Sequence, residues 1–582
     1  MGRQSHSDSR SVLGEDTLTA YDVIVVGSGA GGGMSAYVLT QAGMKVLMLE
    51  SGRDYDPVSE TPMFNLPMAA PLRGQPTPDK PYGFYDATVN GGWEVQDEPY
   101  TLAAGTEFKW WRPRMLGGRT NHWGRIALRF GPYDFKGKAR DGMGADWPLT
   151  YDELSSWYDR TERLIGVTGA SHGFENAPDS PPGVHLTPPP ISPSDYFVSH
   201  GFEALKMPVS AIRVAVLTRP LNGRSACMYS TPCIRGCSIA ANFQSTTVLI
   251  PPARATGNLT VRTDAMVYQI DVDKQGRATG VSFVDKKTGQ HHSVKAKAVV
   301  LAASACESAR ILLNSKSSSF PNGLSNESGL VGRNLMDSVG STTFAQFPSL
   351  ENLPQRHDDG IYGASLRHIY VPWWGYSREA RQGMDFPRGY HIELGGGRIM
   401  PGAYSLPNYA DYCEQTHGDA LRREIKRKYG SYYSFHGNGE MIPNKDSYCE
   451  IDSTVKDIWG IPVLKFHWKW GDTERSQAVH MRNTFKDVVE RLGGTIVRTS
   501  PAEGLLDPGG ATNHEVGTTR MGATPQDAVV NSFGQSWRTK NLFVMDGGVF
   551  ASNSDKNPTL TILALAWRNS AHLIEEARKG NL

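Results

Sequence analysis

Strand-like and helical segments alternate at both ends of the chain. Residues 22–26 (DVIVV) contain four consecutive β-branched residues, a run that is typical of a strand buried on both faces. After a glycine-rich turn, a helical pattern over 34–42 and a strand over 45–50 complete a βαβ unit of about 30 residues. The last part of the chain predicts a strand over 542–546 and a long helix over 558–576. The two ends are therefore expected to form the same kind of α/β layer.

The middle of the chain is richer in strands. Strand-like aromatic segments alternate with turns from residue 341 to about 498, and an amphipathic helix is predicted over 476–492. Further strands are predicted over 259–263, 267–270, 280–284 and 298–303, and another strand follows the DKKTG turn after residue 284. A helix is predicted over 307–313. The pattern predicts an α/β fold (α+β overall), in which a β-sheet-rich unit is inserted between two parts of a Rossmann-like layer.

Composition and charge exclude several classes of protein. Hydrophobic residues make up 39% and charged residues 20%, as in ordinary globular chains. With 60 basic and 59 acidic residues the net charge is +1, so nothing favours binding to nucleic acid or to an anionic membrane surface. Apolar stretches such as 298–303 are far shorter than the roughly 18 residues that span a bilayer, so no transmembrane segment is expected.

Residues 1–18 are polar and predict a flexible N-terminal arm. The first 20 residues contain neither an apolar h-region nor a twin arginine. We therefore expect that the chain has no signal peptide of its own.

The turn after the first strand has the spacing of a dinucleotide-binding motif. Gly27, Gly29 and Gly32 fit G-x-G-x-x-G, and Glu50 follows 18 residues after Gly32, at the end of the second strand. The first glycine permits the tight turn, the second lets the backbone approach a pyrophosphate, and the third lets the helix pack on the strand. The acidic residue accepts hydrogen bonds from ribose hydroxyls. The motif alone does not separate FAD from NAD.

Five further segments, in order along the chain, resemble motifs of the glucose–methanol–choline (GMC) oxidoreductase family. They are GGRTNHWG at 117–124, AASACESAR at 302–310, GLVGRNLMD at 329–337, HEVGTTRMG at 514–522, and DG at 546–547 with NPTLT at 557–561. Ser338 follows the third motif, where histidine is common in the family. The resemblance extends from about residue 20 to residue 578 and implies that the cofactor is FAD.

The resemblance also implies a discontinuous FAD-binding domain and a substrate domain with an antiparallel sheet. We expect the FAD-binding domain at residues 19–345, with covering loops at 57–99 and 178–193. A substrate-binding domain is expected at 346–505, and a return to the FAD-binding domain at 506–582, which carries the catalytic residues.

Within the family, the run WWRPRMLGGRTNHW at 110–123 is similar to the bacterial branch that oxidises sugars, and is nearest to its glucoside 3-dehydrogenases. This implies an FAD-dependent dehydrogenase that oxidises a secondary hydroxyl of a sugar or glycoside, with C3 of a pyranoside favoured. The alternatives are a sugar-acid or polyol dehydrogenase and a pyranose oxidase that uses oxygen. A non-redox flavoprotein scaffold or a lyase is the least favoured.

The catalytic pair implied by the resemblance is His514 and Asn557. A histidine with its ordinary pKa near 6.5 is largely neutral at pH 7 and can take the hydroxyl proton as a base while hydride passes to flavin N5. Asn557 occupies the position of the second member of the pair, where its amide can donate to the substrate oxygen without titrating.

Further residues are assigned to the flavin by the same resemblance. They are Gly117, Gly118, Asn121, His122, Asp546, Gly547, Pro558 and Thr559. Asp546 also fits a helix cap or a turn. A histidine in a setting similar to that of His122 is covalently joined to the flavin in pyranose oxidase-like sequences, but not in related dehydrogenases. Packing of His122 near the isoalloxazine ring is the favoured interpretation.

Three of the six cysteines lie within 11 residues. Cys227, Cys233 and Cys237 have the spacing C-x5-C-x3-C. A disulfide would leave one of them over, and a structural zinc site usually takes four ligands. A [3Fe–4S] cluster can take one thiolate on each iron, and the spacing is similar to that of cluster-bearing flavin subunits of bacterial sugar dehydrogenases. We therefore expect such a cluster, with packed, cluster-free cysteines as the alternative.

Relatives of the multi-subunit kind also imply partners. These are a small subunit that carries a Tat signal and a cytochrome that accepts electrons. The chain is then expected in the cytoplasm, or in the periplasm if it is exported together with such a subunit.

Overall fold

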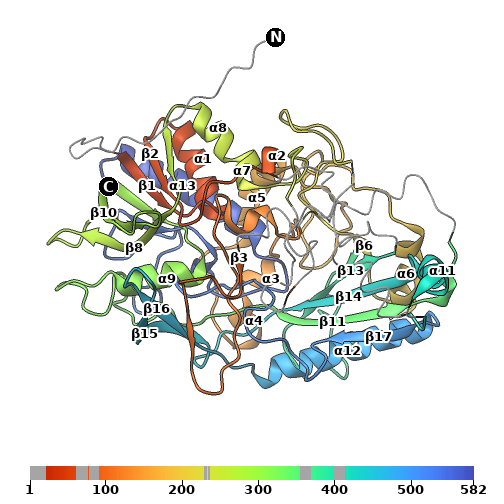
Figure 1. The fold of residues 1–582 in the computed structure, drawn as a ribbon. Helices are drawn as coiled ribbons and strands as arrows, with labels where there is room; N and C mark the ends of the chain where they lie inside the picture. Colours follow the sequence, from red (N-terminus) through yellow and green to blue (C-terminus); the bar gives the residue numbers. More distant parts are fainter. Residues whose placement is uncertain are drawn as a thin grey trace, which may run out of the picture.

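Two β-sheets at opposite ends of the molecule organise the chain (Figure 1). The computed structural model describes residues 21–60, 77, 91–228, 233, 236–353, 369–397, 413–415 and 417–582. The first sheet has seven strands in the order β7-β2-β1-β10-β9-β8, with β18 paired to β10. Its strands are β1 (Tyr21–Val26), β2 (Val46–Leu49), β7 (Leu259–Arg262), β8 (Ala265–Val272), β9 (Ala278–Asp285), β10 (His291–Leu301) and β18 (Leu542–Val544).

Strand β10 joins two kinds of pairing. The sequence predicts two separate strands here, but the structure has one strand of 11 residues. Its first half is antiparallel to β9 and alternates in exposure, as expected of a strand with one solvated face. Its last four residues are all buried, and this half runs parallel to β1 and β18. The change from alternating to continuous burial marks the point where the hairpin enters the parallel sheet.

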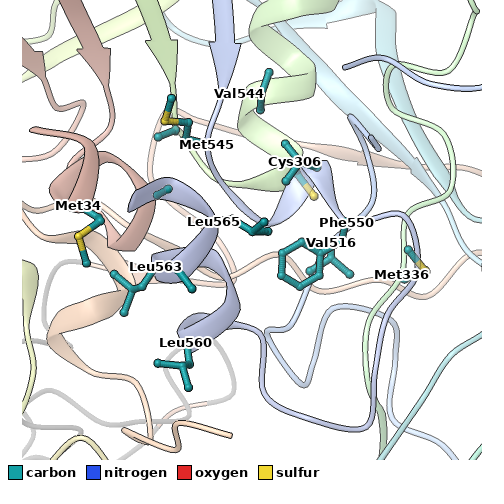
Figure 2. Packing of buried hydrophobic residues seen from close by; sticks show 14 of the residues in the cluster. Met34, Cys306, Met336, Val516, Val544, Met545, Phe550, Leu560, Leu563 and Leu565 are labelled. Carbon is teal, nitrogen blue, oxygen red and sulfur yellow. The ribbon is translucent and has the colours of Figure 1, made fainter. Parts of the chain in front are cut away.

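Helices from the two ends of the chain pack together on this sheet. Helix α1 (Ala30–Gln41) contacts α13 (Thr559–Arg578), which in turn contacts α5 (Tyr151–Ile165). Met34 of α1 and Leu563 of α13 belong to the same buried cluster (Figure 2). This packing gives the α/β layer that the hydrophobic pattern of the two ends predicts.

The second sheet has six antiparallel strands in the order β17-β11-β14-β13-β12-β6. They are β6 (Ser210–Ala211), β11 (Val339–Gln346), β12 (Ile369–Val371), β13 (Tyr390–Gly396), β14 (Tyr432–Gly439) and β17 (Thr495–Ser500). Helix α12 (Asp472–Arg491) covers one face of the sheet (Figure 1). Side chains alternate along β13. Tyr390 therefore points towards α12, where its hydroxyl lies 2.7 Å from Nδ1 of His480, while His391 and Glu393 point to the other face.

The remaining strands of the described residues form two small sheets. They consist of β4 (Thr101–Leu102), β15 (Tyr448–Lys456) and β16 (Pro462–His467), and of β3 (Gly91–Gly92) and β5 (Arg112–Pro113). The other helices are α2 (Pro57–Glu60), α3 (Pro132–Phe135), α4 (Gly137–Asp141), α6 (Pro193–Glu203), α7 (Ser245–Val248), α8 (Ile250–Ala255), α9 (Ala305–Asn314) and α11 (Gly418–Lys428). The described ranges also include the 3₁₀-helices η4 (Gly118–Asn121), η6 (Pro348–Leu350) and η8 (Gly547–Val549).

Several predictions concern connecting segments. The segment predicted as a covering loop at 178–193 contains no helix or strand over residues 178–192, and α6 begins at Pro193. Of residues 57–99, only 57–60, 77 and 91–99 lie within the described part, which includes α2 and β3. The predicted arm at 1–18 lies outside the described residues. No helix within the described ranges is long and apolar enough to cross a membrane.

Candidate active site

The glycine-rich turn lies between β1 and α1, against the ends of two neighbouring strands. Gly27 has φ +94°, and a Cβ there would lie 2.4 Å from the carbonyl oxygen of Ala302. A Cβ on Gly32 would lie 2.0 Å from the carbonyl oxygen of Gly27. A Cβ on Gly29 would have nothing within 4 Å. Backbone packing thus requires the first and third glycines, while Gly29 borders open space.

The start of α1 suits an anionic group. Its N-cap is Gly29, without a side-chain cap, and its first turn has no acidic residue. Amide groups at such a helix start attract phosphate. Glu50, at the end of β2, accepts hydrogen bonds from the amides of Ser28 (3.2 Å) and Gly52 (2.8 Å). The carboxylate therefore also holds the turn itself in place.

A cavity of about 410 Å³ begins at this turn and is lined by segments that are far apart in the sequence. The predicted site residues that line it are Gly27, Gly29, Glu50, Gly118, His122, His514, Asp546, Gly547, Asn557, Pro558, Thr559 and Cys233. The predicted residues outside the lining are Gly32, Gly117, Asn121, Cys227 and Cys237. The structure thus gathers the motif at the N-terminal turn and both members of the predicted catalytic pair around one space.

Two residues outside the lining support it from behind. The Gly117 amide donates to the Ser28 hydroxyl over 2.8 Å, which ties the segment to the glycine-rich turn. The Asn121 amide donates to the carbonyl oxygen of Leu116 over 2.8 Å, and Asn121 is fully buried. Both residues hold the segment that contains His122.

His514 presents an imidazole to the cavity that is neutral at ordinary pH. Burial lowers its pKa to about 4; the nearby Glu393 carboxylate opposes this shift, and His436, His391 and Arg119 add to it. A neutral imidazole has one nitrogen free to accept a proton. The site therefore keeps His514 in the form that a base requires.

A hydrogen-bonded segment orients this imidazole. Nδ1 of His514 lies 2.9 Å from Oγ of Ser338, and the His514 amide donates to Asp337 over 2.9 Å. Ser338, which stands where histidine is common in the family, thus contacts the predicted base. If Nδ1 carries the proton and donates to Ser338, Nε2 is the nitrogen with a free lone pair.

Asn557 reaches the cavity from the loop before α13 and is held by a carboxylate on the other sheet. Its Nδ2 donates to Oε1 of Glu393 over 3.0 Å. The same Oε1 atom lies 3.2 Å from Nε2 of His391. Glu393 also lines the cavity that contains His514. The second sheet thus contributes an acidic group to the site.

His122 is buried and neutral. Burial lowers its pKa to about 3, with Arg125 and Arg119 adding to the shift. The indole N–H of Trp111 donates to Nε2 of His122 over 2.8 Å. Because Nε2 accepts this hydrogen bond, the proton of the neutral ring lies on Nδ1.

Asp546 lines the cavity and also caps a 3₁₀-helix. Its Oδ1 caps η8 by accepting from the amide of Gly548 over 2.8 Å. Oδ2 accepts from the hydroxyl of Ser308 over 2.5 Å. Burial raises the pKa of this carboxyl to about 6. The side chain lines the cavity and also acts as a structural cap.

The cysteine segment borders the same cavity through Cys233. Within the described part of the chain, which includes all three of these cysteines, no group of three or more His, Cys, Asp or Glu side chains is arranged to hold a metal ion. Burial raises the pKa of the Cys233 thiol to about 11. Cys233 and Cys237 lie close enough to interact electrostatically, and Cys227 packs against the small buried cluster that contains Cys233, so the cluster remains a prediction.

Sequence reasoning missed Ser338, Glu393 and His391. For Ser338 a signal existed, since it departs from the family pattern directly after the GLVGRNLMD motif. For His391 and Glu393 the only signal is their i, i+2 spacing within a strand, which places two polar side chains on one face of an otherwise apolar segment.

The residues present fit FAD. Gly29 leaves room where a pyrophosphate would approach the uncapped start of α1, and Glu50 lies at the end of β2, next to that turn. The same cavity is also lined by His122, His514 and Asn557. A dinucleotide bound at the turn would thus extend towards the predicted catalytic pair.

Comparisons with known proteins show the family of this chain. Residues 143–339 and 443–566 match the N-terminal and C-terminal family models of GMC oxidoreductases. The chain is 30% identical to 2-methyl-1,2-propanediol dehydrogenase of Mycolicibacterium austroafricanum, over 94% of each chain. It is 27% identical to the fructose dehydrogenase large subunit of Gluconobacter japonicus, over 98% of this chain and 100% of the relative.

The fold also matches a solved structure, pyridoxine 4-oxidase from Mesorbium loti. The TM-score is 0.58 at 17% identity, over 95% of this chain and 99% of that structure. The dinucleotide turn, the shared cavity, the two family models and relatives of the same length all lead to one assignment. This chain belongs to the GMC oxidoreductase family, whose members depend on FAD.

Proposed function

We propose that this enzyme is an FAD-dependent dehydrogenase that oxidises a secondary hydroxyl of a sugar or glycoside, with C3 of a pyranoside favoured. The observation that carries the proposal is that His514 and Asn557 line the same cavity as the dinucleotide turn. The relatives named above act on fructose and on a diol, which supports a hydroxyl group as the reacting group.

In this proposal the chain's own residues position the substrate and handle its proton. Bound FAD would accept the hydride that leaves the carbon. Nε2 of His514 takes the hydroxyl proton, while Nδ1–H donates to Ser338. Asn557, held by Glu393, hydrogen-bonds the substrate oxygen from the opposite element. Residues that would hold FAD are Gly27, Gly29, Glu50, Gly118, His122, Asp546, Gly547, Pro558 and Thr559.

A second candidate is oxidation of a small diol or polyol. It is favoured by the relative at 30% identity, which is named a 2-methyl-1,2-propanediol dehydrogenase. Anaerobic mixing of the yellow enzyme with a methyl glucoside, a free sugar, a sugar acid and a 1,2-diol distinguishes the candidates. Fastest bleaching by the glycoside supports the first proposal, and fastest bleaching by the diol supports the second.

The cysteine segment supports a further part of the proposal, a [3Fe–4S] cluster at Cys227, Cys233 and Cys237. The support is electrostatic, since Arg125 and Arg224 are buried near these thiols. Among the described residues, neither guanidinium has a carboxylate within ion-pair distance. Burial lowers the pKa of each guanidinium to about 10, and the nearby cysteines oppose the shift. An anionic thiolate-bound cluster would neutralise this charge.

Iron analysis and low-temperature EPR after anaerobic purification test the cluster. Iron that is lost in Cys233→Ser but kept in Cys449→Ser supports it, because Cys449 is a buried thiol on β15 outside the segment. Protein without iron rejects it.

Partners and compartment belong to the same proposal. The fructose dehydrogenase relative is named a large subunit, which supports pairing with a smaller subunit. We propose such a subunit, with a Tat signal that would carry both chains to the periplasm, and a cytochrome as the electron acceptor. Co-purification of a small subunit with the tagged chain from its native cells tests this pairing.

A further inference from the structure

A row of buried, alternately charged side chains leads away from the predicted catalytic pair. Starting at Asn557, the row passes through Glu393, His391, Asp555 and Lys556 to Asp134, and all its members are buried. The contacts are Asn557 Nδ2–Glu393 Oε1 (3.0 Å), Glu393 Oε1–His391 Nε2 (3.2 Å), His391 Nδ1–Asp555 Oδ2 (3.6 Å), Asp555 Oδ1–Lys556 Nζ (2.7 Å) and Lys556 Nζ–Asp134 Oδ2 (3.1 Å). The row joins the second sheet to the loop before α13.

His391 occupies the central position of this row. Each of its ring nitrogens faces a carboxylate oxygen, Glu393 on one side and Asp555 on the other. A neutral imidazole carries one N–H and would turn a lone pair towards one of the two carboxylates. The imidazolium donates from Nε2 to Glu393 and turns a positive Nδ1–H towards Asp555 at 3.6 Å, an ion-pair distance that is longer than a hydrogen bond. The geometry therefore favours the cation.

Electrostatics agree with this geometry. Burial disfavours the charged imidazole, but the carboxylates of Asp555 and Glu393 outweigh it and raise the pKa of His391 to about 9. Burial also disfavours the charged form of Asp555, yet Lys556 and His391 hold the pKa of this carboxyl well below its ordinary value. His391 and Asp555 thus form an ion pair inside the protein.

We propose that His391 is a positioning residue: as an imidazolium between Asp555 and Glu393, it fixes the Glu393 carboxylate and, through it, the amide of Asn557 beside the reacting hydroxyl. The inference rests on the proposed roles of His514 and Asn557. Buried ion pairs often contribute little net stability, and their best-supported role is to select one arrangement. Here the selected arrangement is that of Asn557, whose Oδ1 is buried without a hydrogen-bond partner in the described structure.

The pH dependence follows from the groups around His391. Glu393 lies on the same strand as His391, Asp555 and Lys556 lie on the loop before α13, and Tyr370 lies on β12. His436 and His514 lie on the catalytic side. The other titratable or charged groups surround a small adjacent cavity or the end of the row, and they are Asp134, Arg129, Glu175, Arg213 and Tyr376. Above its pKa, His391 loses one N–H and releases one of its two carboxylates. The rate of flavin reduction is therefore expected to fall as pH rises through about 9.

The test is stopped-flow flavin reduction across pH in the holoenzyme, with whichever hydroxyl substrate bleaches the wild type. His391→Gln is expected to lower the rate constant by about 10- to 100-fold, as for a misplaced positioning group, and to abolish the alkaline decline. In an Asn557→Ala background the same change is expected to cost less than about 2-fold, because residues that act through one another are not additive.

His480→Gln is the matched control. His480 hydrogen-bonds Tyr390, the neighbour of His391 on β13, but on the opposite face of the strand. We expect this variant to keep the wild-type rate and pH profile, and FAD content and thermal melting are measured for every variant. If His391→Gln does not fold, Asp555→Asn takes its place and is expected to move the alkaline decline to lower pH, since it removes one of the two carboxylates.

Either of two results overturns the inference: an alkaline decline that His391→Gln and Asp555→Asn leave unchanged, or losses that add fully with Asn557→Ala. A wild-type flavin that no hydroxyl compound bleaches removes the proposed function, and this inference with it. A bleached wild type with unaffected variants removes the inference alone.

Discussion

Oγ of Ser338 lies 2.9 Å from Nδ1 of His514. The hydroxyl is therefore placed to hold one ring nitrogen and to leave the other available, as a base with a defined tautomer requires. Ser338→Ala removes this contact and should lower the rate of flavin reduction by about 3- to 10-fold, the effect of one hydrogen bond. Ser434→Ala is a matched control, because Ser434 donates to a backbone carbonyl on β13 instead. An unchanged rate in Ser338→Ala would contradict the orienting role.

Replacing the predicted base should have a larger effect. His514→Ala is expected to lower the rate by at least about 10²-fold, the low end for general base catalysis, while FAD stays bound. Asn557→Ala should cost less, because it removes a positioning group and leaves the proton acceptor in place. The measurement is anaerobic single-turnover reduction with FAD content determined on the same samples. Normal turnover of His514→Ala would refute the assignment.

The acidic side of the pH profile should reflect the environment of His514. Because burial lowers its pKa to about 4, the imidazole stays deprotonated well below its ordinary value near 6.5. The protonated form cannot accept a proton, so activity is expected to be lost as pH falls through about 4. The pH dependence of kcat/KM in the free enzyme tests this. An acidic decline centred near 6.5 would show that the buried setting does not persist in solution.

Replacing two neighbouring glycines by alanine should change different properties, stability in one case and FAD affinity in the other. A Cβ on Gly31 would lie 1.7 Å from the carbonyl oxygen of Met545, so Gly31→Ala should destabilise the protein by about 1–3 kcal/mol or more. A Cβ on Gly29 meets no protein atom within 4 Å, so Gly29→Ala should fold normally but bind FAD at least about 10-fold more weakly. Thermal melting of the apoproteins and FAD titration distinguish the two effects. Equal behaviour of the two variants would contradict the placement of the pyrophosphate at Gly29.

Flavin attachment should be non-covalent. Nε2 of His122 accepts the indole N–H of Trp111, so that nitrogen is already used in a hydrogen bond. Acid precipitation is therefore expected to leave yellow FAD in the supernatant and a colourless pellet. A yellow pellet in the wild type that becomes colourless in His122→Ala would show a covalent bond instead.

Much of the fold could be predicted because its signals are local. The β-branched run before Gly27 and the 3.6-residue pattern of α13 depend only on neighbouring residues, and both elements form where expected. Strand β10 was predicted as two pieces because its exposure pattern changes in the middle, although its backbone does not break. Periodicity reports the burial of a face and does not report the continuity of a strand.

The site was predictable only where ordered motifs marked it. The resemblance singled out His514 and Asn557, and the structure places both around one cavity. Glu393 and His391 carry no motif, and their role depends on β13 of one sheet facing a loop that precedes α13. Such a contact joins residues more than 160 positions apart, which neither composition nor local spacing can show.

The proposed oxidation of a glycoside is tested most directly by an anaerobic reaction whose product is identified. The enzyme with bound FAD is mixed with a methyl glucoside, the flavin absorbance is followed, and the product is identified by NMR. We predict that the yellow colour bleaches, that one equivalent of a 3-keto glycoside forms per flavin, and that His514→Ala with FAD bound bleaches at least about 10²-fold more slowly. A flavin that dithionite reduces but no sugar, glycoside or diol bleaches would contradict it, as would a colourless protein that binds NAD.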